Sequence, residues 1–203
     1  MLVLYKIINK FYFIIYKFSS SIYFFLLKKA FRFNLGKNYT INGFPRFILK
    51  MKSKLVIGEN FSMNSGNLYN PIGRNQRCLI SVSKDAFLKI GDNVGLSSVA
   101  IVCQKKITIG NNVRIGGNTI IYDTDFHSLN SVERTSIPEN ATNIKRKEVS
   151  IGDNVFIGGH SLILKGVSIG DNAIIGAGSV VSKSVPPNEI WAGNPAVQIR
   201  KNI

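Results

Sequence analysis

The chain is poor in the residues that most often build metal centres and disulfide frameworks. Among its 203 residues are two cysteines, Cys78 and Cys103, and two histidines, His127 and His160. Two cysteines outside a CxxC pair give no disulfide framework, and two histidines cannot supply a three-histidine zinc site. The composition favours a reduced, cytoplasmic setting, and we expect no metal at the functional site.

Acidic residues are missing from the first part of the chain. Residues 1–54 contain 11 lysines and arginines, and the first carboxylate belongs to Glu59. The whole chain carries a formal net charge of +15, so the basic excess is concentrated at the N-terminus. Such charge can serve nucleic-acid binding, but the aromatic residues of this segment lie among aliphatic ones. We therefore expect no nucleic-acid partner.

Long uncharged runs are absent as well. The longest one in the N-terminal segment, Phe18 to Leu27, has 10 residues, whereas a membrane-spanning helix needs about 20. Four lysines of the segment fall within about 40° on one face of a helix. They are Lys6, Lys10, Lys17 and Lys28. A lysine stripe opposed by apolar residues predicts peripheral contact of residues 1–33 with an anionic membrane. Packing on the protein itself, or on a neighbouring subunit, and a spanning helix are the alternatives.

What the sequence does contain is a period of six residues near its end. An aliphatic residue recurs every six positions, and a small or branched residue follows four positions after each one. The aliphatic positions are Ile151, Ile157, Ile163, Ile169, Ile175 and Val181. Neither a helix nor an alternating strand has this period. With Gly-Asp-Asn at several corners, it predicts a parallel β-helix, in which three hexapeptides make one turn of a triangular prism.

The period continues upstream with one long interruption. It is lost for 30 residues between Ile121 and Ile151, where 6 were expected, and Ile57 looks like the entry turn. About six turns with a spacing of about 4.8 Å would give a prism roughly 30 Å long.

These patterns predict two parts of the chain. Residues 1–53 are expected to form a helical, basic extension, and residues 54–203 the all-β domain. Within that domain we expect a functional loop near 123–149 and a C-terminal cap over 186–203.

Several motifs carry a family resemblance over residues from about Lys54 to the C-terminus. They are Ile115–Ile120, Asp123–Ser128, Asn154–His160, Ile175–Lys183 and Ala192–Ala196, followed by Ile199 and Arg200. They resemble the hexapeptide-repeat acyltransferases, above all the galactoside, maltose and surface-polysaccharide O-acetyltransferases. The resemblance implies a left-handed parallel β-helix and a homotrimer. It also implies acetyl-CoA as co-substrate and a carbohydrate as acceptor.

His127 stands where the period fails, at the start of the interruption. Sites tend to lie on loops displaced from a rigid scaffold, and acyl transfer to a hydroxyl needs one base near neutrality. The resemblance implies that His127 is this general base, in a direct transfer without a covalent intermediate. Asp125 is a candidate to orient the imidazole or to contact the acceptor, and Asp123 is a second candidate to orient the ring. Both would share one face with His127 if the strand continued. A backbone carbonyl in their place remains an alternative.

The resemblance assigns further residues to the two substrates. Asn118 and Phe156 are expected near the acceptor, and the backbone of Gly158 and Gly159 is a candidate oxyanion site. Coenzyme A is expected in a groove between two prisms. The residues implied there are Gly159, Ala177, Ser182, Lys183 and Arg200. His160 is interpreted as a corner residue, and the segment Leu129–Glu148 is expected to overhang the acceptor.

We therefore predict a trimeric acetyl-CoA-dependent O-acetyltransferase acting on a sugar of a lipid-linked or surface-polysaccharide precursor. The membrane-directed N-terminus is the reason for this choice of acceptor, and it places the enzyme in the cytoplasm or at the inner face of the cell membrane. N-acetylation of an amino sugar, and acetylation of serine or an antibiotic, are alternative reactions. A non-catalytic β-helix scaffold is an alternative of another class, and it would not be expected to bind coenzyme A.

Overall fold

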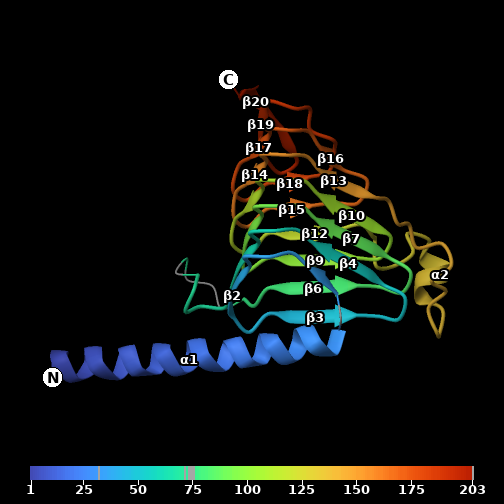
Figure 1. The fold of residues 1–203 in the computed structure, drawn as a ribbon. Coiled ribbons are helices and arrows are strands. Elements are labelled where there is room, and N and C mark those ends of the chain that lie inside the picture. Colours follow the sequence, from blue (N-terminus) through green and yellow to red (C-terminus); the bar gives the residue numbers. More distant parts are fainter. Residues whose placement is uncertain (32, 71, 73–75, 203) are drawn as a thin grey trace.

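Three sheets form the sides of a triangular prism, and the chain passes from one sheet to the next at each corner (Figure 1). The computed structural model describes residues 1–31, 33–70, 72 and 76–202. The first sheet contains β1 (Asn34–Leu35), β4 (Lys54–Ile57), β7 (Phe87–Ile90), β10 (Lys106–Ile109), β13 (Val149–Ile151) and β16 (Ser168–Ile169).

The other two sheets repeat this arrangement. The second sheet contains β2 (Thr40–Gly43), β5 (Ser62–Ser65), β8 (Gly95–Ser97), β11 (Arg114–Ile115), β14 (Phe156–Ile157), β17 (Ile174–Ile175), β19 (Glu189–Gly193) and β20 (Ala196–Lys201). The third sheet contains β3 (Arg46–Leu49), β6 (Leu79–Val82), β9 (Ala100–Cys103), β12 (Ile120–Tyr122), β15 (Leu162–Ile163) and β18 (Val180–Val181). All neighbouring strands are parallel except β19 and β20, which form the antiparallel hairpin that closes the C-terminal end.

The six-residue period fixes the register of this stack. Ile109 pairs with Ile90 in the turn below it and with Ile151 in the turn above it. Its side chain and the equivalent side chains of the other strands point into the prism and are almost completely buried. The strands thus contribute one or two inward side chains each to a continuous core; β10, for example, contributes both Ile107 and Ile109. The predicted fold class, a left-handed parallel β-helix with an N-terminal helix, is confirmed.

The three corners differ in chemistry, and we name them by their residues. The asparagine corner follows the first sheet and includes residues 58–60, 91–93, 110–112, 152–154 and 170–172. The glycine corner follows the second sheet and includes residues 98, 116–118, 158–160 and 176–178. The lysine corner follows the third sheet and includes residues 50–53, 83–86, 104–105, 123–148, 164–166 and 182–184.

Side-chain amides form a continuous ladder along the asparagine corner. Each asparagine has a positive φ, and each Nδ2 donates to the Oδ1 of the next over 2.9 to 3.0 Å. The ladder runs through Asn60, Asn93, Asn112, Asn154, Asn172 and Asn188. Asparagine is among the few residues that tolerate the left-handed conformation. The same side chain therefore makes the turn and joins one coil to the next.

The N-terminal part is less helical than predicted. Helix α1 spans Leu2–Phe31, and β1, β2 and β3 follow it within the expected extension. These strands pair with β4, β5 and β6, so they form the first turn of the prism. The entry turn is therefore one turn earlier than the Ile57 predicted from the sequence. The division of the chain into two domains at residue 53 stays a prediction.

Helix α1 lies across the base of the prism, and its N-terminal half extends past the sheets (Figure 1). Three residues of its C-terminal half, Ser20, Phe24 and Leu27, are buried against the base. Every residue from Met1 to Ile15 is exposed. In the described part of the chain, no helix combines the length and the apolar character needed to cross a membrane.

Replacement of Asn112 should separate the two contributions that an asparagine of the ladder makes to stability: its amide hydrogen bonds and its left-handed backbone conformation. We expect Asn112→Ala to lower the free energy of unfolding by about 2 to 4 kcal/mol, because it loses two amide contacts and strains a left-handed residue. Asn112→Gly should cost only about 1 to 2 kcal/mol, since glycine removes the strain. Urea unfolding of both variants measures the difference. Equal losses would contradict the role assigned to the backbone conformation.

Candidate active site

The interruption of the repeat leaves the prism at the lysine corner. Strand β12 ends before it, and β13 resumes the first sheet after it. The N–H of Asp125 donates to Lys145 O over 3.1 Å, and the N–H of Lys147 donates to Asp123 O over 2.9 Å. This short antiparallel ribbon closes the base of the excursion. Beyond it the chain forms the helix α2 (Ser131–Thr135) on the outside of the prism (Figure 1).

His127 lies just beyond the ribbon and pairs with a carboxylate from the far end of the excursion. Its Nδ1 is 2.8 Å from Oε2 of Glu139, and the backbone N–H of Ser128 donates to Oε1 of the same residue over 3.2 Å. The hydrogen bond from His127 is the main cause that lowers the pKa of Glu139 below its usual value. The imidazole remains 65% exposed. With Nδ1 held by a carboxylate, Nε2 is the nitrogen oriented to accept a proton from solvent or substrate.

A second carboxylate holds the excursion in shape. The hydroxyl of Ser128 and the amide of Asn143 donate to Glu133, and these hydrogen bonds, with that from Ser128 the larger cause, lower the pKa of Glu133. The guanidinium of Arg134 donates to the carbonyl of Ser128 over 2.8 Å. Because Ser128 is the neighbour of His127, these contacts restrain the backbone that carries the imidazole.

The two carboxylates predicted to orient His127 do not contact it. The strand ends at Tyr122, and Phe126 has a φ of 63°, so the alternation that would align Asp123, Asp125 and His127 is broken. Asp125 instead forms an ion pair with Lys165, with 2.6 Å between Oδ1 and Nζ. Oδ2 of Asp125 is buried and has no partner among the described residues. Its predicted contact with the acceptor stays a prediction.

Asp123 is fully buried, and its carboxylate binds backbone groups of the scaffold. Its Oδ1 accepts the N–H of Gln104 over 2.7 Å, and its Oδ2 accepts those of Lys105 and Lys106 over 2.7 and 2.8 Å. These three charge-assisted hydrogen bonds give a partner to each of the backbone N–H groups at residues 104–106, one coil below. Burial, followed by the nearby Asp123 charge, raises the pKa of Cys103 to about 12, so this thiol remains protonated.

The glycine corner holds the residues expected near the acceptor and the oxyanion. The N–H of Gly158 donates to Ile175 O over 2.8 Å, so the predicted oxyanion site cannot use it. Asn118 and His160 occupy left-handed positions, with φ of 61° and 62°. Oδ1 of Asn118 is buried without a partner among the described residues, which leaves it able to accept a hydrogen bond from a ligand.

The residues expected to bind coenzyme A lie on two corners and one sheet of the chain. Gly159 and Ala177 lie on successive coils of the glycine corner, where the N–H of Gly178 donates to Gly159 O over 2.9 Å. Ser182 and Lys183 are exposed at the lysine corner, and Arg200 is exposed on β20 of the second sheet. A single prism therefore does not gather this set into one place.

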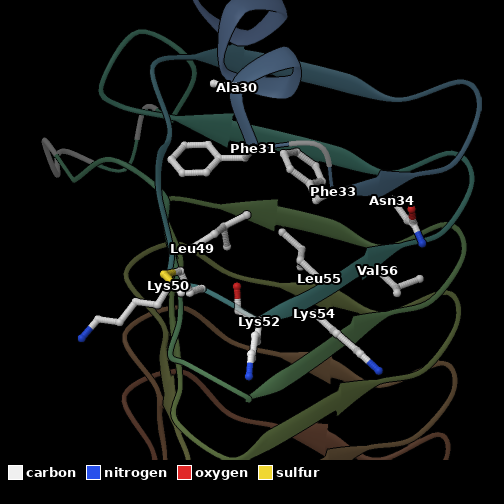
Figure 2. Close-up of a pocket in the computed structure, with 12 residues that line it drawn as sticks. Ala30, Phe31, Phe33, Asn34, Leu49, Lys50, Lys52, Lys54, Leu55 and Val56 are labelled. Atoms are coloured by element: carbon white, nitrogen blue, oxygen red, sulfur yellow. The ribbon is translucent and has the colours of Figure 1, made fainter.

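Phe156 lies on the outer face of the second sheet and is 50% exposed. With Arg114, Asn64 and Ser97 it lines a surface hollow of about 260 Å³. A larger hollow of about 560 Å³ lies at the base of the prism, and no residue of the excursion lines it (Figure 2). The volume of a hollow therefore does not by itself identify the candidate active site.

Glu139 was missed from the sequence. It follows His127 by 12 residues in a segment without periodicity, so no spacing rule relates the two residues. The described residues contain no group of three or more histidine, cysteine, aspartate or glutamate side chains arranged to hold a metal.

Comparisons with known proteins agree with this architecture. The family model for the hexapeptide repeat of succinyl-transferase matches residues 148–183. A hexapeptide-repeat acetyltransferase from Vibrio cholerae is 25% identical, with a TM-score of 0.59, and the match covers 91% of this chain and 81% of that one. A galactoside acetyltransferase in complex with coenzyme A is 28% identical, with a TM-score of 0.55 and coverages of 88% and 68%.

An N-acyltransferase from Bacillus cereus, solved with dTDP and 3-hydroxybutyryl-CoA, shares the fold at 22% identity. Its TM-score is 0.59, and the match covers 86% of each chain. No curated protein matches the sequence. In its repeats and its parallel prism, the chain is similar to hexapeptide-repeat acetyltransferases, and its residues 148–183 match the model of the hexapeptide repeat itself.

Proposed function

We propose that the protein transfers an acetyl group from acetyl-CoA to a hydroxyl group of a sugar. The observation that carries this proposal is the contact of 2.8 Å between His127 Nδ1 and Glu139. It leaves an exposed imidazole with its second nitrogen available, on an excursion whose backbone is held by hydrogen bonds at Ser128. One base of this kind is what direct acyl transfer requires.

The reaction is a direct transfer with His127 as general base. Nε2 takes the proton of the acceptor hydroxyl while the oxygen attacks the thioester carbonyl. The tetrahedral intermediate collapses with cleavage of the C–S bond, and the coenzyme A thiolate receives the proton from the imidazolium. Glu139 holds the ring in the productive tautomer and stabilises its protonated form. Neither Cys103 nor any other covalent nucleophile is needed.

Coenzyme A is the proposed acyl carrier because the galactoside acetyltransferase that resembles this chain was solved with coenzyme A bound. We place it along the glycine corner, beside Gly159 and Ala177, and we keep Phe156 as an aromatic contact of the acceptor. Ser182, Lys183 and Arg200 are the proposed contacts for the rest of the cofactor, the two cations facing its phosphates.

The third sheet supplies the surface for the proposed homotrimer. Most of its outward positions are apolar, with Arg46 and Ser81 as the polar exceptions. The apolar ones are Ile48, Leu79, Ala100, Val102, Ile120, Leu162 and Val180, with Tyr122 beside them. The outward positions of the first sheet are mostly polar, and include Lys54, Lys89, Lys106, Thr108, Ser150 and Ser168. A flat apolar sheet face of this extent is stabilised by packing on copies of itself.

Packing of three third sheets around one axis would also complete the site. The third sheet is bounded by the glycine corner on one side and the lysine corner on the other. In a ring of three, the glycine corner of one copy therefore meets the lysine corner of the next. Asn118 and Ala177 of one copy would then lie beside His127 and Lys183 of its neighbour. The predicted residues, separated within one chain, converge between chains.

We further propose that the acceptor belongs to a lipid-linked or surface-polysaccharide precursor. The support is the basic and aromatic helix α1, whose exposed apolar residues suit peripheral contact with an anionic membrane. An amino group could accept the acetyl group from the same base, so amino sugars belong in any panel of acceptors.

Replacement of His127 by alanine tests the base. We expect turnover to fall by about 10² to 10⁴, because the hydroxyl loses its proton acceptor, while coenzyme A binding is retained. Release of free thiol from acetyl-CoA in the presence of hydroxyl and amino sugars measures it. His160→Asn is the matched control, since asparagine also tolerates a left-handed corner. Most activity surviving in a folded His127→Ala protein would refute the assignment.

Glu139→Gln and Asp125→Asn together decide which carboxylate orients the ring. We expect Glu139→Gln to lower kcat by at least about tenfold, since the amide cannot stabilise the imidazolium. Asp125→Asn should act mainly on the KM of the acceptor. Because the pKa of Glu139 is lowered, its carboxylate stays ionised throughout the pH range above the usual carboxyl pKa. Its support of the His127 ring is lost only when the pH falls through this lowered pKa. The reverse pattern of kcat and KM would favour Asp125.

A charge on the third sheet tests the assembly. We expect Leu162→Asp to turn the trimer into monomers and to abolish transfer, because an unpaired carboxylate cannot be buried in the interface. Thr108→Asp places the same charge on the outward face of the first sheet and should leave the mass unchanged. Light scattering during gel filtration measures both. A Leu162→Asp trimer would show that another face forms the interface.

A further inference from the structure

Helix α1 has two different faces, and the structure shows which one is covered. Ser20, Phe24 and Leu27 are buried against the base of the prism. On a helical wheel with about 100° per residue, the opposite direction is occupied by apolar side chains over the whole length of the helix. These are Leu4, Ile7, Phe11, Ile14, Ile15, Phe18, Ile22 and Phe25, which are 45% to 68% exposed.

The lysines of α1 flank this apolar face instead of interrupting it. Lys6, Lys10, Lys17 and Lys28 form one stripe about 110° from the direction of Phe11 and Phe18. Long lysine side chains in this position can extend sideways while the apolar face is buried. The only lysine near the centre of the apolar face is Lys29, in the last turn.

The base around the helix is also positive. Figure 2 shows a hollow between the end of α1 and the first turn of the prism, with Phe31 and Phe33 beside it. Lys50, Lys52 and Lys54 line it, and their side chains extend away from α1. They add to the potential of the base over about a Debye length, but they do not belong to the apolar face.

We infer that α1 binds the surface of an anionic membrane with this apolar face, so that the prism stands upright on its N-terminal base. Because the buried face of α1 contacts the base, its opposite face points along the prism axis, away from the sheets. A membrane that takes up this face lies parallel to the helix. The prism axis is then close to the membrane normal.

The charges of α1 decide between a second copy of the chain and a membrane as the surface that covers its apolar face. A second copy would bring the lysine stripe of one helix towards that of another, and residues 1–54 offer no carboxylate to pair with it. Anionic headgroups supply that complement along the whole stripe. Interfacial helices bind reversibly. In the proposed trimer three helices would bind at the same level, which strengthens the contact by multivalency.

This orientation fixes the height of the excursion above the membrane. Only the conclusion about the acceptor rests on the proposed function. The lysine corner of β12 lies three strand spacings above that of β3, or about 15 Å. The helix adds its diameter of about 10 Å. His127 thus emerges about 25 Å or less above the bilayer, so a lipid-anchored acceptor must present its hydroxyl on an extended headgroup and not within the bilayer.

Vesicle sedimentation with the full chain tests the binding. Vesicles of phosphatidylcholine with phosphatidylglycerol, and of phosphatidylcholine alone, are the probes. We expect the double variant Phe11→Ser and Phe18→Ser to bind at least about tenfold more weakly. Lys10→Gln with Lys17→Gln should weaken binding to the anionic vesicles only. Retention on a coenzyme A resin confirms that each variant is folded.

Lys89→Gln with Lys201→Gln is the matched control, since it removes the same charge at exposed positions away from α1 and should bind as the wild type does. The inference would be overturned if the wild-type protein did not bind anionic vesicles, or if the serine variants bound them as tightly as the wild type does. Serine variants that change the oligomeric mass without lipid would also overturn it, because the face would then belong to a second copy. Vesicle binding with no acetyl transfer would contradict the proposed function and leave the membrane contact standing.

The single tryptophan of the chain reports the orientation. Trp191 lies in β19, six strand spacings from β2, which is about 29 Å. Brominated lipids should leave its fluorescence unchanged in vesicle-bound wild type. They should quench the fluorescence of a Phe18→Trp protein in which Trp191 is replaced by phenylalanine. Quenching of Trp191 in the wild type would show that the prism lies on its side, against the inference.

Discussion

The hydrogen bonding between successive corners is the constraint on which the rest of the structure depends. A strand of two to four residues cannot hold its register alone, and here the corners hold it. The asparagine ladder joins each coil to the next through both its backbone conformation and its amide contacts. A second line of side chains reinforces it, because Asp153 accepts the N–H of Asn111 and Asp171 accepts that of Asp153. With the corners fixed, one or two inward side chains per strand suffice to fill the core.

The same constraint explains where an excursion can leave the prism. An insertion at a corner opens the stack and leaves backbone N–H groups of the coil below without their partners. Asp123 meets this requirement, because one buried carboxylate accepts three such groups at residues 104–106. Leaving those donors unpaired would cost on the order of 1 to 3 kcal/mol for each. Asp123, at the start of the excursion, therefore maintains the scaffold, while Glu139 within the excursion contacts His127.

The fold was predictable because its repeat is encoded residue by residue, and the errors have physical causes. The first turn was missed although Leu35, Ile41 and Phe47 also stand six apart. The basic and aromatic character of the surrounding segment outweighed that signal. The partner of His127 could not be predicted in the same way. Alternation along a strand favoured Asp125, but a left-handed residue at Phe126 ends the alternation. Loop contacts of this kind depend on closure in space and leave no period in the sequence.

Three directions in the molecule are linked by its architecture. Stacking of the coils defines the prism axis, and packing through the third sheets would place a threefold axis parallel to it. Helix α1 lies across that direction because Phe24 and Leu27 fasten it to the base. Any surface that binds the outer face of α1 is therefore perpendicular to both axes, and all copies of the helix reach it at the same height. A trimer of this geometry would present three equivalent sites to one membrane, each at the same distance from it. The constraint that sets the register of the strands thus also sets the distance between His127, the proposed general base, and the proposed membrane.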